Sequence, residues 1–110
     1  MEKRYDIMLT NKEIGNLYIT QAKFRNWPQI AGMITACQKG ENIFNHPAII
    51  SRCDEDGELE ISDGHHRLMA KYLSGQSLAD SEYTLVSGPP IRSRYGRIKE
   101  YRNKNEQDSV

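Results

Sequence analysis

The stretch with the clearest chemical potential is Asp63-Gly64-His65-His66-Arg67, which lies where a strand is expected to end and a helix to begin. A helix N-terminus presents free backbone N–H groups and the positive end of the helix macrodipole, so it attracts phosphate or another anion. Glycine lets the backbone adopt a positive φ and lets an oxyanion approach closely. The neighbouring histidines and arginine add side-chain donors, and arginine offers a planar fork that matches phosphate oxygens. The phosphate-binding residues that we predict are Gly64, His65, His66 and Arg67.

Asp63 needs a different role, because its carboxylate would repel an anion. It can cap the following helix, orient a histidine, or hold a metal ion that sits on the phosphate. Simpler readings exist, since Asp-Gly is also an ordinary turn and an isolated histidine is most often a solvated residue. Adjacent helical histidines point about 100° apart, which disfavours a zinc site even with His46 as a third ligand. The concentration of all five residues at one junction favours a functional site.

The elements that position this stretch follow from the pattern around it. Residues 47–53 and 58–62 are β-prone and bracket Asp54-Glu55-Asp56-Gly57, an acidic turn of the kind that joins antiparallel strands. A helix that ends at Gly75 is expected after the hairpin. Its apolar residues recur at the spacing of one helical face: Leu68, Met69, Tyr72 and Leu73.

The other elements are predicted from capping signals and short apolar runs. Asn26, Pro28 and Gln29 together satisfy the amide groups of a helix start, and Gly40 marks the end of that helix. Its buried face is predicted to consist of Ile30, Met33, Ile34 and Cys37. Further strands are predicted at residues 4–9, 17–20 and 83–87, with a turn at residues 11–15.

The C-terminal part of the chain differs from the rest in its basic character. Gly88-Pro89-Pro90 ends the last strand, and Ile91, Tyr95 and Ile98 are spaced to line one side of a helix. We therefore divide the chain into a domain of residues 1–90 and a basic helix or tail of residues 91–110. The predicted nucleic-acid-binding residues in this tail are Arg92, Arg94, Arg97 and Lys99.

Composition limits the classes of protein that fit. The 110 residues suit one domain, and 37% hydrophobic and 27% charged residues with no net charge describe a polar globule. General affinity for nucleic acid is not indicated. Cys37 and Cys53 are expected to be reduced and buried. No apolar run approaches the length of a membrane span, so we expect a cytoplasmic protein that does not bind membranes.

The order of these features resembles the ParB/sulfiredoxin superfamily. In that superfamily an Asp-Gly-His-His-Arg type box opens the helix that follows a hairpin, as residues 63–67 do here. The match covers about residues 15–87, and the box with its hairpin is the specific part. The resemblance implies an α+β fold, a small mixed sheet with flanking helices in a single domain. It also implies that the box binds nucleotide phosphates, usually with magnesium.

Departures from the superfamily narrow the expected activity. Sulfiredoxins carry a catalytic cysteine where this chain has His65, so sulfinic-acid reduction is not expected. Chromosome-partition members append DNA-binding and dimerisation domains, and this chain ends soon after its last predicted strand, so DNA clamping is not expected. Free-serine kinases resemble the box most closely but take a general base from outside it. The candidate bases here are Glu41, Glu60 and Asp63.

Two functions of different classes remain. The first is a phosphotransferase or nucleotide hydrolase that uses Mg²⁺ and ATP, ADP or CTP, with Asp63 as the magnesium ligand. Its predicted catalytic residues are Asp63, His65, His66 and Arg67. The alternative is a non-catalytic factor of phage or plasmid type that binds nucleic acid or a protein partner through its basic tail. A ParB-like nuclease lies between them, although the sequence shows no second carboxylate cluster for two-metal cleavage.

Overall fold

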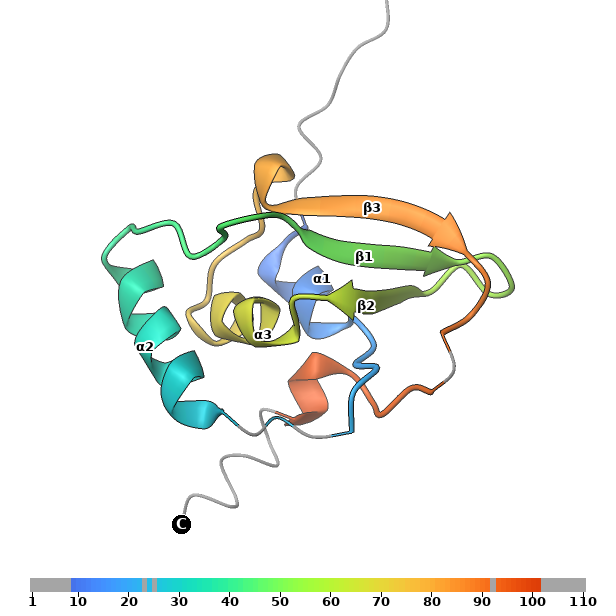
Figure 1. Ribbon diagram of the computed structural model, residues 1–110, viewed down its shortest axis with the longest axis horizontal. Coiled ribbons are helices and arrows are strands. Elements are labelled where there is room, and N and C mark those ends of the chain that lie inside the picture. Colours follow the sequence, from blue (N-terminus) through green and yellow to red (C-terminus); the bar gives the residue numbers. More distant parts are fainter. Residues whose placement is uncertain (1–8, 23, 25, 92, 102–110) are drawn as a thin grey trace, which may run out of the picture.

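The computed structural model describes residues 9–22, 24, 26–91 and 93–101, and it shows a small single-domain α+β protein (Figure 1). In the described residues a three-stranded mixed sheet is combined with three α-helices, one short 3-10 helix and a further helical turn at residues 98–101, which confirms the predicted class. The elements in chain order are α1 (Asn11–Gly15), α2 (Trp27–Gln38), β1 (Ala48–Cys53), β2 (Leu59–Asp63), α3 (His65–Leu73), η1 (Asp80–Glu82) and β3 (Tyr83–Gly88).

The sheet has the strand order β2-β1-β3. Strands β1 and β2 are antiparallel, so the predicted hairpin is confirmed, and Gly57 in its turn adopts a φ of 75°. Strand β3 returns parallel to β1 after the chain has crossed through α3 and η1. The predicted strand at residues 4–9 lies outside the described residues except for Leu9, which forms an isolated antiparallel bridge with Leu78.

The core lies between the sheet and the helices. Figure 1 shows α1 and α3 on one side of β1 and β2, with α2 alongside α3. Ile50 and Ile61 from the sheet and Leu68 from α3 are fully buried there. The predicted apolar faces are confirmed in part: Ile30 and Cys37 of α2 are buried, and the other two residues of that face are half-buried. None of the helices in the described part is long and apolar enough to span a bilayer.

Two N-terminal predictions were wrong. Residues 11–15 form α1 rather than a turn, because Thr10 accepts a hydrogen bond from the Glu13 amide and the Glu13 side chain accepts one from Thr10. This capping box stabilises the start of a helix. Residues 17–20 form no regular strand. Instead, Tyr18 makes an isolated bridge beside β2, donating to the Leu59 carbonyl at 3.0 Å and accepting from the Ile61 amide at 2.9 Å.

The segment after β3, which was predicted as a basic helix or tail of residues 91–110, packs on the rest of the protein in its described part. Ile98 is fully buried in the core. The Ile19 amide donates to the Gly96 carbonyl, and the Tyr95 amide donates to the Ile19 carbonyl, each at 2.8 Å. Within the described residues, the expected C-terminal helix is limited to a turn at residues 98–101. Burial of Ile98 and pairing with residues 17–19 hold this segment on the body of the protein.

Candidate functional site

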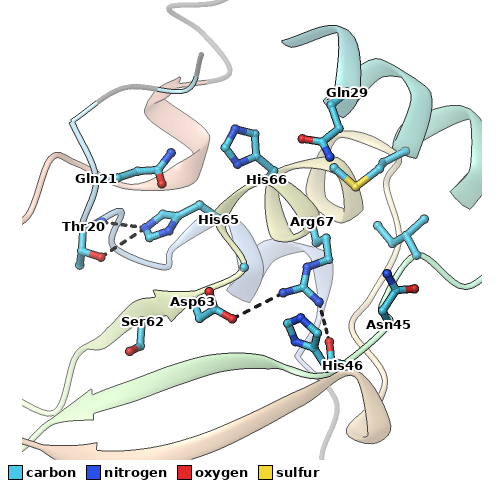
Figure 2. Close-up of a pocket in the computed structure, with 13 residues that line it drawn as sticks. Thr20, Gln21, Gln29, Asn45, His46, Ser62, Asp63, His65, His66 and Arg67 are labelled. Carbon is cyan, nitrogen blue, oxygen red and sulfur yellow. Dashed lines mark hydrogen bonds and ion pairs between the residues drawn. The ribbon is translucent and has the colours of Figure 1, made fainter. Parts of the chain in front are cut away.

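A cleft of about 760 Å³ lies at the N-terminus of α3 (Figure 2). Four parts of the chain line it: residues 20 and 21, the first half of α2, the loop before β1, and the junction of β2 with α3. The predicted catalytic and phosphate-binding residues come together here, because all of residues 63–67 contribute to the lining of the cleft. His46, which was considered as a metal ligand, also lines this cleft.

Gly64 fixes how α3 begins. It is the N-cap residue, with φ 97° and ψ 28° in the left-handed region. A side chain here would be strained by this backbone conformation. It would also collide, since an added Cβ would lie 2.9 Å from the Ala48 Cβ and 3.3 Å from Nη2 of Arg67. The start of α3 is therefore packed directly against β1, in a way that only glycine permits.

The first turn of α3 has no side-chain cap. The amides of His65, His66 and Arg67 precede the first intrahelical hydrogen bond, which the Leu68 amide donates to the Gly64 carbonyl at 2.9 Å. Asp63 does not act as the cap residue, which is Gly64. No acceptor for these three amides is found among the described residues, so the end of the helix that borders the cleft carries unpaired donors in that part of the chain, together with the positive end of its macrodipole.

Arg67 lies across this helix end. Its Nη1 donates to the His46 carbonyl, and its Nη2 lies 3.6 Å from Oδ2 of Asp63 (Figure 2). The guanidinium carbon is 5.3 Å from the centroid of the Phe44 ring. Asp63 is half-exposed and its ion pair is partly solvated, so the pair itself contributes little to stability. These contacts hold the guanidinium beside the helix N-terminus, where a bound anion would meet it.

His65 is buried and joins α3 to the loop at residue 20. Its Nε2 accepts a hydrogen bond from the Thr20 amide at 3.0 Å and lies 3.3 Å from the Thr20 hydroxyl, which itself donates to the Ile61 carbonyl at 2.6 Å. Because a backbone N–H can only donate, Nε2 carries no proton and Nδ1 carries it. Burial lowers the pKa of His65 to about 4. The nearby His66 lowers this pKa further, whereas the Asp63 carboxylate raises it by a smaller amount. His65 is therefore neutral at pH 7.

His66 forms part of the cleft wall and packs against Phe24, with ring centroids 5.4 Å apart in an edge-on arrangement. Burial lowers the pKa of His66 below its usual value. Its Nε2 is buried and has no hydrogen-bond partner among the described residues. Phe24 also contacts Trp27 and Tyr101, with centroids 5.7 Å and 5.5 Å away. Sequence reasoning missed this aromatic cluster, because it joins Phe24 and Trp27 to His66 and Tyr101, which lie about 40 and more than 70 residues further along the chain.

Only one of the candidate general bases borders the cleft. Asp63 lines it, whereas Glu41 is exposed elsewhere. Glu60 is fully buried, where it accepts hydrogen bonds from the Ile91 amide at 3.1 Å and from Nε of Arg94 at 2.7 Å. Among the described residues there is no group of three or more histidine, cysteine, aspartate and glutamate side chains that would hold a metal ion.

The two described arginines of the C-terminal segment, Arg94 and Arg97, are engaged within the protein. Arg94 donates to both carboxylate oxygens of Asp56, at 2.9 and 3.2 Å, as well as to Glu60, and the hydrogen bond from Arg94 holds the pKa of Asp56 well below its usual range. Arg97 donates to the Asn16 carbonyl and the Tyr18 hydroxyl. Lys99 is exposed, and Arg92 lies outside the described residues. Most of the described cationic groups of this segment therefore fasten it to the domain.

Comparisons of the chain with protein-family models, curated proteins and solved structures find no match. What the site can do chemically thus follows from its own geometry. The first amides of α3, the Arg67 guanidinium and the imidazoles of three histidines line a polar cleft together with the Asp63 carboxylate. The donors of this set suit an anionic group with several oxygen acceptors.

Proposed function

We propose that the protein binds the phosphates of a nucleotide, ATP, ADP or CTP, in this cleft and, with magnesium, transfers or hydrolyses a phosphoryl group. The observation that carries the proposal is the junction at Gly64. There a left-handed N-cap without a side chain leaves the first amides of α3 free beside Arg67 and a cleft of about 760 Å³. Phosphate binds at such helix termini through backbone N–H groups and the macrodipole.

Each residue of the box has a distinct role in this proposal. The amides of residues 65–67 donate to phosphate oxygens, and the Arg67 guanidinium stabilises charge that develops during transfer. His65 supplies its amide and, through its bond to Thr20, a fixed start for the helix rather than a positive charge. His66 supplies its amide and part of the cleft wall. Gly64 provides the space in which an oxyanion approaches the backbone.

Magnesium fits the site only as an ion carried with the phosphates. Asp63 is the one carboxylate among the described residues that line the cleft. That number is compatible with Mg²⁺, which commonly keeps several water ligands and binds one or two carboxylates together with substrate phosphates. Asp63 would hold the ion, and the bound ion would neutralise negative charge on the phosphates.

A second candidate is nucleotide binding without turnover, as in a sensor. It is favoured by the absence of a well-placed general base among the described lining residues. The pKa of His65 is about 4, the pKa of His66 is also lowered, and Asp63 is paired with Arg67. A catalytic base works best with a pKa near the working pH. Binding of nucleic acid or a protein through the tail has less support, since Arg94 and Arg97 are paired within the protein.

The test is ligand-induced stabilisation followed by a measurement of turnover. Thermal melts are recorded with ATP, ADP or CTP plus Mg²⁺, because a ligand at 100 times its Kd stabilises the folded state by about 2.7 kcal/mol. Arg67→Ala should weaken binding about tenfold or more, since a hydrogen bond to a charged group contributes roughly 1.5–3 kcal/mol. The matched control is Arg52→Ala, which removes an exposed arginine of β1 that does not line the cleft.

Three outcomes are distinguishable. Stabilisation that is equal in the wild type and Arg52→Ala, and reduced to about half or less in Arg67→Ala, supports the binding site. Phosphate release or phosphoryl transfer in the same samples then supports the enzyme, and its absence supports the sensor. No stabilisation by any of the three nucleotides at millimolar concentration would contradict both.

A further inference from the structure

The charged side chains that line the cleft balance each other within the described residues. Arg67 is the cation and Asp63 is the carboxylate, and they lie 3.6 Å apart as an ion pair. His65 adds no charge at pH 7, because burial lowers its pKa to about 4. Burial also lowers the pKa of His66. A nucleotide brings several negative charges, so the described lining meets such a ligand without a net positive charge.

His46 is the described lining side chain that can supply additional positive charge. It is exposed, whereas His65 is buried and His66 is half-buried. In Figure 2 the His46 ring lies below Arg67, on the side of the cleft away from His66. No hydrogen-bond or ion-pair partner of this ring is found among the described residues. Histidine is the side chain whose charge ordinarily changes between about pH 8 and pH 5.

The backbone of His46 is fixed beside the start of α3. Its carbonyl accepts the hydrogen bond from Nη1 of Arg67. Pro47 follows, and a residue before proline is restricted to extended conformations. Ala48 then begins β1 and is fully buried, and its Cβ would be 2.9 Å from a Cβ placed on Gly64. The His46 side chain is therefore attached to a backbone that is held against the helix terminus.

We propose that protonated His46 is a ligand of the nucleotide phosphates, so that the cleft binds a nucleotide more tightly as the pH falls. This inference rests on the proposed function and adds a binding residue that lies outside the box at residues 63–67. The imidazolium donates from the loop before β1, whereas the amides and Arg67 donate from α3. A phosphate group is then bound by donors from two separate elements.

The charged groups around His46 act on its protonation in opposite directions. From α3, the Arg67 guanidinium opposes a second positive charge, and the two histidines of that helix have pKa values lowered by burial. From β2, the Asp63 carboxylate favours the positive charge. The other described lining side chains, from α2 and from residues 20, 21, 43, 45 and 62, are uncharged. A bound anion also favours the protonated ring, and by linkage protonation strengthens anion binding by the same factor.

Isothermal titration calorimetry with ATP, ADP or CTP plus Mg²⁺ at pH 8 and pH 6 tests the inference. The wild type should bind about tenfold more tightly than His46→Gln at pH 6, because hydrogen bonds with an ionised donor are the strong ones. At pH 8 the two proteins should differ by less than about twofold. Phosphate groups themselves titrate near pH 6, and comparing the two proteins at the same pH removes this effect.

Two further variants separate charge from structure. His46→Lys carries a positive charge at both pH values, so its advantage over His46→Gln should be present at pH 8 as well as at pH 6. Arg52→Gln is the matched control, because it removes an exposed positive charge of β1 outside the cleft and should change neither affinity. Circular dichroism at both pH values checks the fold. If His46→Gln does not fold, His46→Asn makes the same comparison.

The outcomes separate this inference from the proposed function. If nucleotides bind but the wild type and His46→Gln differ by the same factor at both pH values, this inference is overturned and the binding site stands. An advantage of the wild type that is larger at pH 8 also overturns it, because that sign is expected if neutral His46 ligates Mg²⁺. If no nucleotide binds to the wild type at either pH, the proposed function and this inference both fail.

Discussion

Replacing Gly64 with alanine tests the close packing on which the site depends. The φ of 97° costs a residue with a Cβ roughly 1–2 kcal/mol. The added methyl would also lie 2.9 Å from the Cβ of Ala48, which is fully buried. Overpacking of this kind costs about 1–3 kcal/mol. Gly64→Ala should therefore lower the free energy of unfolding by about 2–5 kcal/mol.

Gly75 provides a matched control at the other end of the same helix. Its φ is 77°, and an added Cβ would have no atom within 4 Å. Gly75→Ala should thus cost only the backbone part, roughly 1–2 kcal/mol. Urea titrations followed by circular dichroism measure both losses, provided that the slopes of the two variants agree. Equal losses for the two variants would refute the close approach of β1 and α3 at Gly64.

Two further predictions concern buried ionisable groups. Since the pKa of His65 is about 4 in the folded protein, the unfolded chain takes up that proton first, and the free energy of unfolding should fall as the pH decreases from about 6.5 to about 4. The loss is on the order of 3 kcal/mol, and urea titrations at several pH values should show it reduced in His65→Gln. Arg94→Met should lower the free energy of unfolding by about 3–5 kcal/mol, because it leaves the Glu60 carboxylate buried without its cation. The double variant Arg94→Met with Glu60→Leu should recover most of this loss in the same titration. If the double variant and Arg94→Met lose the same free energy of unfolding, the explanation is wrong.

The sequence alone was sufficient where the determining interactions are local. The start of α2 follows from Asn26, whose side chain accepts a hydrogen bond from the Gln29 amide at 3.1 Å. The β1–β2 hairpin follows from its acidic turn and Gly57, and Gly75 ends α3 as predicted. The box at the junction of β2 and α3 was located for the same reason, because strand end, glycine and helix start are consecutive in the chain.

Tertiary structure decided what the chemically active side chains do. His65 was predicted to offer a side-chain donor to phosphate, but burial keeps it neutral, and its Nε2 accepts a hydrogen bond from Thr20, which is 45 residues away in the chain. Arg94 looked like a free cation, but it pairs with Asp56 and Glu60, more than thirty residues earlier. The charge and availability of a side chain depend on its burial and its partners, which the fold supplies from distant parts of the chain. Residue order therefore locates the candidate site, and three-dimensional packing determines its electrostatics.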